Sequence, residues 1–432
     1  MKIGIVGGGF HGLVLGHLLS KEHEVSIFEK DVTLGGLLQT ADFKDFRLEK
    51  YYHHIFLRDS HIVELFRELG IENELGWHQS TTSVFAKGKF FPFFKPMELL
   101  RFPHLGIFSK LRLGLATLFL QNLKKGEKLN HLNAKAWIKK VMGSEAWEVL
   151  WRPLFEGKFS RYSEEISLSW FWSRISYKRG SKTGKDEVLG YPKESFQIII
   201  DKLIGSIVKK NGKIFSGKET VEIVIDGGRA AGIKTKEGNI DFDLIISTVA
   251  PPLFLKLIPG APDAFKDELK KIRYLGAITA ILVLKEKLAP AYWNNILDVE
   301  IPFKAVIEQT NLDGSARYGA KHLAYTSHYT PVDSEYFKAD NAQLIKMYMP
   351  HLKKINGRAE ENLLEYRIYR DCFCQPIISV DYPQAIIDFK TPITNLYQFS
   401  MAQIFPEDRG LNIAVREAKK IVLEIAEKFD KP

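Results

Sequence analysis

Hydrophobic and polar residues form three successive patterns at the start of the chain. The apolar run Ile3-Gly4-Ile5-Val6 has the length and composition of a buried strand. After a cluster of glycines, apolar positions recur at helical spacing, with Leu13, Leu18 and Leu19 on the inner side. A second apolar run covers residues 24–29. This order predicts a strand-helix-strand unit at the start of an α/β domain.

The glycines between the first strand and the helix have the spacing of a dinucleotide-binding turn. Gly7, Gly9 and Gly12 form a GxGxxG pattern in the required strand-to-helix context. Gly7 permits the turn, Gly9 lets a pyrophosphate approach the helix N-terminus, and Gly12 allows close packing of helix and strand. Glu29 lies 22 residues after Gly7, where a carboxylate accepts hydrogen bonds from an adenosine ribose. The pattern predicts a Rossmann-type site for NAD or FAD, or a Rossmann unit that has lost its ligand.

Further elements follow from capping residues and turns. We expect helices over residues 60–69 with Ser60 as N-cap, 134–142 with Asn133 as N-cap, and 195–210 closed by Asn211 and Gly212. The turn at residues 226–228 between two apolar runs predicts a hairpin. Residues 243–249 read as a buried strand that returns to the first sheet.

Composition and charge narrow the class of protein. A chain of 432 residues is too long for one core and predicts two domains. The net charge is +9, and residues 84–128 hold nine basic and two acidic residues, together with eight of the 29 phenylalanines. That segment predicts either the core of a helical region or a surface that lies on anionic lipid. No nucleic-acid motif accompanies the charge, so we expect no nucleic-acid partner.

Cysteine usage and the start of the chain bear on location and metal binding. With only two cysteines, Cys372 and Cys374, the chain offers no four-ligand zinc set and no disulfide framework. Lys2 leads directly into the first strand without a secretory signal pattern. We therefore expect a cytoplasmic protein without a metal site. The apolar runs are too short to cross a bilayer, so any contact with a membrane would be peripheral. The oligomeric state stays open.

A second glycine pair decides between NAD and FAD. Leu34-Gly35-Gly36-Leu37-Leu38 follows Glu29 by five positions and resembles the superfamily of FAD-containing amine oxidases, protoporphyrinogen oxidases and phytoene desaturases. The phrases at residues 151–160, 169–172 and 189–196 resemble a bacterial and archaeal branch of the protoporphyrinogen-oxidase-like flavoproteins. Relatives usually carry arginines beside the glycine pair, where this chain has Leu34 and Leu37. The resemblance implies FAD, with backbone amides or Lys30 facing its phosphates.

The resemblance also implies how the domains are divided. A Rossmann-type FAD-binding domain of α/β class would be interleaved with an α+β substrate domain that carries a helical insertion. The expected FAD-binding parts are residues 1–58, 195–274 and 386–432, and the expected substrate parts are residues 59–194 and 275–385. Met401 stands where many relatives have Gly-Asp. The candidate cofactor-binding residues are Gly7, Gly9, Phe10, His11, Gly12, Glu29, Lys30, Gly35, Gly36, Leu37, Val221, Met401, Asp408 and Asn412.

Candidate catalytic residues are His53, His54 and Arg409. The histidines end an aromatic stretch that, by the resemblance, passes the flavin ring, and imidazole transfers protons near neutral pH. Only one of two adjacent side chains on an extended strand faces inward, and a histidine bonded to backbone for structure is the alternative. Arg409 is a candidate for binding an anionic substrate, such as a phosphate or carboxylate. Arg161 and Arg174 are weaker candidates, for which a surface salt bridge is the alternative.

Three functions compete on this basis. The first is an FAD-dependent oxidoreductase that removes hydride from a small or lipid-linked, for example polyprenyl-linked, substrate. The second is a flavin-dependent sugar isomerase of the UDP-galactopyranose mutase type, and the third is a non-catalytic flavoprotein. Flavin supplies the redox chemistry itself, so no acid-base triad is needed. The sequence leaves the substrate and the electron acceptor open.

Overall fold

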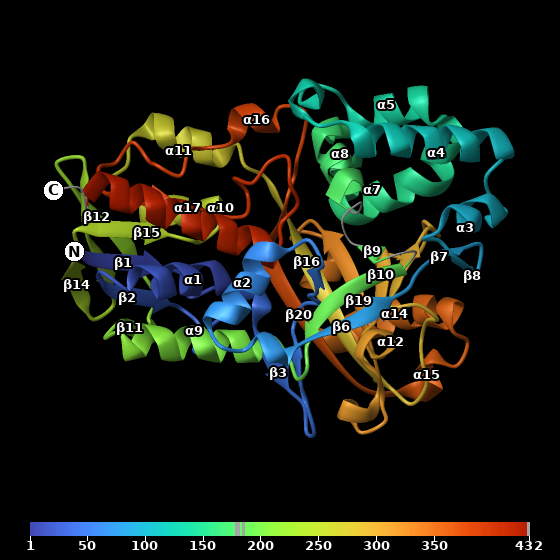
Figure 1. Ribbon diagram of the computed structural model, residues 1–432, viewed down its shortest axis with the longest axis horizontal. Coiled ribbons are helices and arrows are strands. Elements are labelled where there is room, and N and C mark those ends of the chain that lie inside the picture. The colour runs from blue at the N-terminus through green and yellow to red at the C-terminus, as the bar shows by residue number, and fades with distance from the viewer. Residues whose placement is uncertain (178–181, 184–185, 430–432) are drawn as a thin grey trace.

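The computed structural model of the chain describes residues 1–177, 182–183 and 186–429. Its first layer is a parallel five-stranded sheet whose strands come from distant parts of the sequence (Figure 1). The order is β11-β2-β1-β15-β21, and every neighbouring pair is parallel. The strands are β1 (Lys2–Val6), β2 (Glu24–Glu29), β11 (Lys213–Ser216), β15 (Leu244–Ser247) and β21 (Leu396–Gln398). This sheet confirms the predicted Rossmann-type α/β fold.

Side-chain alternation in β1 explains how the two faces of this sheet are covered. Ile3 and Ile5 are fully buried against three helices, α1 (Phe10–Leu19), α9 (Gln197–Lys209) and α17 (Leu411–Phe429). Gly4 faces the other way, where a Cβ would meet Ile233 and Phe242. Ile233 belongs to the small antiparallel sheet β12 (Glu222–Asp226), β13 (Arg229–Thr235) and β14 (Gly238–Asp241), which contains the predicted hairpin. The part of the fold built on the parallel sheet is therefore a three-layer α/β/β stack.

A mixed seven-stranded sheet forms the second large layer. Its order is β20-β16-β19-β18-β17-β7-β8, and within it only β17 and β7 pair in parallel among the pairings of the described residues. The strands are β7 (Thr82–Ala86), β8 (Lys89–Pro92), β16 (Tyr274–Leu284), β17 (Trp293–Ile296), β18 (Ala305–Glu308), β19 (His322–Thr330) and β20 (Leu363–Pro376). Leu282 packs towards α14 (Asn341–Ile355), whereas its neighbours Ile281 and Val283 belong to the core that also contains the parallel sheet and helices α1, α9 and α17.

Helices over residues 96–177 make a separate group at the upper right of Figure 1. It contains α3 (Pro96–Arg101), α4 (Ile107–Asn122), α5 (Ala134–Val141), α7 (Arg152–Phe159) and α8 (Leu168–Tyr177). Asn133 caps α5 as predicted, because its side chain accepts a hydrogen bond from the Ala136 amide. A smaller antiparallel sheet has the order β5 (Ile55–Phe56), β10 (Asp186–Pro192), β6 (Leu75–Ser80), and β9 (Lys182–Thr183) also pairs with β10. The predicted domain boundaries themselves stay a prediction.

One predicted cap is wrong. Helix α2 spans Ser60–Glu68, and Asp59, not Ser60, is its N-cap residue. The Asp59 carboxylate instead accepts from the Phe56 amide. The amide of Ile62 in the first turn donates to the side chain of Asn412, 3.1 Å away at the start of α17. A tertiary contact therefore caps this helix, which local sequence signals do not reveal.

Candidate functional site

The glycine turn after β1 has the geometry that the sequence predicted. Gly7 has φ +105°, a region that favours glycine. A Cβ on Gly12 would stand 2.1 Å from the carbonyl oxygen of Gly7, so helix α1 can lie this close to the strand only with glycine there. Gly9 is the N-cap of α1 and caps it without a side-chain hydrogen bond. The turn therefore delivers a helix N-terminus at the carboxyl edge of the parallel sheet.

The second glycine pair lies directly against this turn. The Gly35 amide donates to the Gly8 carbonyl at 2.8 Å, and the Phe10 amide donates to the Gly35 carbonyl at 3.2 Å. Gly36 has φ +58°, and its Cβ would lie 3.1 Å from the Cα of Gly9. Two bare backbone segments, separated by 27 positions in the sequence, thus face each other with no side chain between them. We call this feature the Gly9–Gly36 cradle.

Glu29 lies at the end of β2, beside the cradle. Its two carboxylate oxygens accept from the amides of Gly8 at 2.7 Å and Asp31 at 2.9 Å. Burial raises the pKa of the carboxyl, while these two amide donors and Lys30 oppose the rise. The two amides fix the orientation of the carboxylate, and each oxygen keeps a further lone pair for a hydroxyl donor. Lys30 is exposed and Leu37 is half-buried.

A cofactor with a diphosphate and a ribose fits these residues. The cradle offers space next to a helix N-terminus that a side chain would otherwise fill, and helix N-termini bind phosphate. Glu29 supplies the acceptor for ribose hydroxyls at the expected distance along the sheet edge. The sequence predicts each of these residues for the cofactor, because the motif is local and its spacing is fixed by the strand-turn-helix geometry; their cofactor-binding roles stay predictions.

Two other candidates near the turn have structural partners. Phe10 is buried in the core. The Nδ1 of His11 lies 2.9 Å from the carbonyl oxygen of Ala414 in α17, and its ring lies 4.7 Å from that of Phe399. Burial lowers the pKa of His11 to about 4, so the ring is neutral and Nδ1–H is the donor. This histidine ties α1 to α17.

The remaining cofactor candidates lie on three separate segments. Val221 precedes β12, is 44% exposed, and donates its amide to the Lys234 carbonyl at 2.8 Å. Met401 is half-buried and packs on the core that contains the parallel sheet. The side-chain oxygen of Asn412 accepts a hydrogen bond from the Ile62 amide at the N-terminus of α2. The cofactor-binding roles of these residues stay predictions.

The two candidate histidines have different partners. The Nδ1 of His53 donates to the carbonyl of Tyr51 at 2.7 Å, and burial lowers the pKa of His53 to about 4. The Nδ1 of His54 lies 3.0 Å from the hydroxyl of Tyr292. Adjacent side chains therefore point to different surroundings, as the alternation of extended backbone requires. His53 makes the backbone bond expected of a structural histidine, yet at neutral pH its Nε2 is also a proton acceptor.

Arg409 and Asp408 lie in a cluster of charges that joins three parts of the fold. The Oδ2 of Asp408 accepts from Lys158 Nζ in α7 at 2.9 Å and lies 3.1 Å from Arg174 Nη1 in α8. Arg409 donates from Nη2 to the hydroxyl of Tyr329 in β19 at 2.6 Å. Burial favours protonation of Asp408, but the three cations outweigh it and hold its pKa well below the usual range.

Sequence reasoning missed Lys158 and Tyr329 as members of this cluster. Lys158 carries no motif, and it meets Asp408 across 250 positions of sequence. Arg174 forms a salt bridge, as the alternative predicted, but with a largely buried partner. Arg161 lies on the surface beside Tyr162, away from the cluster. Lys158, Arg174, Tyr329 and Asp408 therefore come together only through the tertiary fold.

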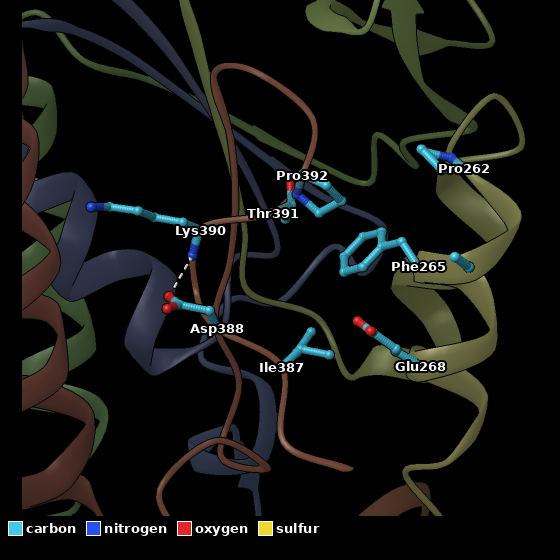
Figure 2. A pocket seen from close by; sticks show the side chains of 9 residues that line it. Pro262, Phe265, Glu268, Ile387, Asp388, Lys390, Thr391 and Pro392 are labelled. Atoms are coloured by element: carbon cyan, nitrogen blue, oxygen red, sulfur yellow. Dashed lines mark hydrogen bonds between the residues drawn. The ribbon is translucent and has the colours of Figure 1, made fainter. Parts of the chain in front are cut away.

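A surface pocket of about 450 Å³ lies elsewhere, between α11 (Asp263–Lys270) and residues 387–392 (Figure 2). Its lining includes Phe265, Glu268 and Asp388, whose carboxylate accepts from the Lys390 amide at 3.0 Å. None of the predicted site residues lines it. Among the described residues no group of three or more His, Cys, Asp or Glu side chains is arranged to hold a metal ion.

Comparisons with known proteins agree with this architecture. The model of the family described as flavin containing amine oxidoreductase matches residues 16–384. An uncharacterised protein of Methanocaldococcus jannaschii is 27% identical over 257 residues, which cover 58% of this chain and 59% of that relative. The match thus spans less than two thirds of the relative's length.

Solved structures share the fold at low sequence identity. An oxidoreductase from Methanosarcina mazei has a TM-score of 0.76 at 20% identity, covering 98% of this chain and 100% of that one. Reduced UDP-galactopyranose mutase has a TM-score of 0.74 at 17% identity, covering 98% of this chain and 96% of that one. The family resemblance seen in the sequence is confirmed.

Proposed function

We propose, because the chain belongs to the family of flavin-containing amine oxidoreductases, that it is an FAD-dependent oxidoreductase that removes hydride from a small or lipid-linked organic substrate. The observation that carries the proposal is the Gly9–Gly36 cradle with Glu29 beside it. When bound, FAD supplies the hydride-accepting chemistry. The protein's part is to bind the cofactor, orient the substrate, exclude water and move protons.

The residues would divide this work as follows. The cradle and the N-terminus of α1 would bind the diphosphate, and Glu29 would accept from the ribose hydroxyls. Burial lowers the pKa of His53 to about 4, so at neutral pH the ring is neutral and a weak base, and its Nε2 would accept a hydrogen bond from the substrate and take up a proton only as it is released. Its Nδ1 bond to the Tyr51 carbonyl holds the tautomer that leaves Nε2 free of hydrogen.

The test begins with purified protein. We expect it to be yellow and to release stoichiometric FAD on denaturation, because the proposed site is non-covalent. Purified protein that contains no flavin and binds none when FAD is added would overturn the proposal.

A sugar isomerase is the second candidate, since the fold also supports UDP-galactopyranose mutase. An isomerase of this type would be active only when reduced and would consume no oxidant. Substrate that bleaches the oxidised flavin under anaerobic conditions supports the oxidoreductase. Turnover that needs prior reduction with dithionite and leaves the flavin reduced supports the isomerase.

We further propose that α4 docks on anionic lipid. The helix is apolar on both sides: Leu113, Ala116 and Leu120 are buried, whereas Phe108 is 80% and Leu115 is 69% exposed. The exposed apolar residues of α4 are Ile107, Phe108, Leu111, Leu115, Leu118 and Phe119. No helix among the described residues is long and apolar enough to span a bilayer, so contact would be peripheral.

Charge supports lipid as the partner of this face. Arg101, Lys124, Lys125 and Lys128 are exposed near the two ends of α4. Each cation near anionic lipid adds about 1 kcal/mol to binding. Most phenylalanines of residues 84–128 are buried or half-buried, and Phe108 and Phe119 are the exposed ones.

Co-sedimentation with liposomes that contain anionic lipid tests this surface. Binding should fall with added salt and with Phe108→Ser plus Leu115→Ser. Leu423→Ser is the matched control, because Leu423 is 65% exposed on α17, outside this face. Protein that remains in the supernatant at low salt would refute lipid docking.

A further inference from the structure

Three cations surround one carboxylate where the domains meet. Lys158 Nζ and Arg174 Nη1 both approach the same oxygen of Asp408, at 2.9 and 3.1 Å. Arg409 follows Asp408 in sequence and is close enough to depress the pKa of Asp408 further. One negative charge therefore faces three positive charges. The excess predicts affinity for an anion, because like charges this close are costly without a counter-charge.

The hydrogen bonds of Arg409 within the described part of the chain leave one of its donors without an acceptor. Its Nη2 donates to the hydroxyl of Tyr329 at 2.6 Å, and its guanidinium lies over that ring at 5.3 Å. Its Nη1 is buried and has no hydrogen-bond partner among the described residues. A buried guanidinium donor without an acceptor is unfavourable, so the site lacks an acceptor that a ligand would supply.

The surroundings have the character of a substrate site. Lys158 Nζ lies over the rings of Trp170, at 5.6 Å, and Tyr329, at 5.7 Å. The hydroxyl of Tyr52 lies 2.9 Å from the hydroxyl of Ser327, which is 275 positions later in the sequence and on the same strand as Tyr329. The cluster therefore lies between aromatic side chains of the helical group and the large sheet, on the segment that leads into α17. Burial lowers the pKa of His53 most, the bond to the Tyr51 carbonyl opposes that shift, and Arg409 adds a smaller lowering.

We propose that Lys158, Arg174 and Arg409 bind an anionic group of the substrate, a carboxylate or a phosphate. This inference rests on the proposed function, because it names the class of molecule that the enzyme oxidises. Arg409 would donate from Nη1 to the anion, and Lys158 would add a point charge. Asp408 stays as the internal counter-ion that holds Lys158 and Arg174 in place. A substrate that carries only cationic amines would be repelled from this position.

Anion binding to the FAD-loaded protein tests the proposal. Inorganic phosphate and acetate are titrated at constant ionic strength against a chloride control, and the bound flavin spectrum and the melting temperature are recorded. We expect saturable binding of at least one of the two anions, and the tighter one identifies the substrate group. Arg409→Gln should weaken binding at least tenfold, which corresponds to about 1.4 kcal/mol.

Arg161→Gln is the matched control, because Arg161 is exposed and lies outside the cluster. Arg409→Lys keeps the charge and tests whether loss of binding in Arg409→Gln reflects misfolding. We expect Arg409→Lys to bind the anion more tightly than Arg409→Gln does and to melt like the wild type. Equal anion binding by wild type and Arg409→Gln would overturn the proposal, as would an effect of ionic strength alone.

The FAD content of the same samples separates the two proposals. We expect Arg409→Gln to keep stoichiometric FAD, because the cradle and Glu29 are intact. Loss of FAD from Arg409→Gln would assign the arginine to the cofactor and overturn the substrate site. Wild-type protein that binds phosphate but never FAD would instead refute the proposed function.

Discussion

Replacing Gly9 by alanine separates cofactor binding from folding. Gly9 has φ −66° and ψ 170°, which any residue adopts. Apart from its chain neighbours, the new Cβ would meet one atom within 4 Å among the described residues, the Cα of Gly36 at 3.8 Å. That distance is an ordinary contact. The apoprotein should therefore be as stable as the wild type, or more stable by roughly 0.4–1 kcal/mol because the unfolded chain loses freedom.

The same methyl group would occupy the cradle that the diphosphate needs. Displacing the phosphates from one charge-assisted hydrogen bond and from the helix N-terminus costs about 2.7 kcal/mol, or about 100-fold in affinity. At a free FAD concentration of about 1,000 times the wild-type Kd, ligand stabilisation is about 4.1 kcal/mol. It should fall to about 1.4 kcal/mol in Gly9→Ala. Gly9→Val should bind no measurable FAD.

The assay is denaturant unfolding of apo and FAD-loaded protein, with FAD affinity measured by calorimetry. Gly205→Ala is the matched control, because a Cβ there meets nothing within 4 Å in the described structure. Gly12→Ala gives the opposite signature, a less stable apoprotein, because its Cβ would lie 2.1 Å from the Gly7 oxygen. An unchanged FAD affinity in Gly9→Ala and Gly9→Val would refute the assignment of the cradle.

Three further predictions concern titratable side chains. Glu29→Gln should weaken FAD binding roughly ten- to a hundredfold by removing charge-assisted hydrogen bonds to the ribose. Because burial raises the pKa of Glu29, the FAD affinity of the wild type should fall on acidification at a higher pH than it would for an ordinary glutamate. An unchanged dissociation constant in Glu29→Gln would mean that Glu29 only ends the strand. His53→Gln should slow substrate-driven flavin reduction in stopped-flow much more than His54→Gln, and equal small effects would favour structural roles. Since burial lowers the pKa of His11 from 6.5 to about 4, the unfolded chain binds the extra proton, and stability should fall by about 3 kcal/mol between pH 6.5 and 4. His11→Gln should flatten that part of the stability profile measured by urea unfolding, and an unchanged profile would contradict the assignment.

The geometry of the glycine turn was predictable because its determinants are local. Gly7 needs a positive φ, Gly12 needs close contact with the backbone of Gly7, five residues earlier, and Glu29 ends the next strand. Each requirement acts over a single strand-turn-helix unit, so residue type and spacing report it directly. The hairpin at residues 226–228 was predictable for the same reason, since Gly227 and Gly228 both adopt positive φ.

The tertiary structure alone decided where the other charged and polar side chains meet. Lys158 reaches Asp408 across 250 positions, and Asn412 caps a helix that begins 352 positions earlier. The ring of His11 hydrogen-bonds the carbonyl of Ala414 in the last helix, a contact that the sequence does not reveal, and its predicted part in cofactor binding stays a prediction. Long-range contacts of this kind depend on how strands from five segments assemble into one sheet. Hydrophobic periodicity specifies which face of each element is buried, whereas the identity of its neighbour is set only when the layers pack together.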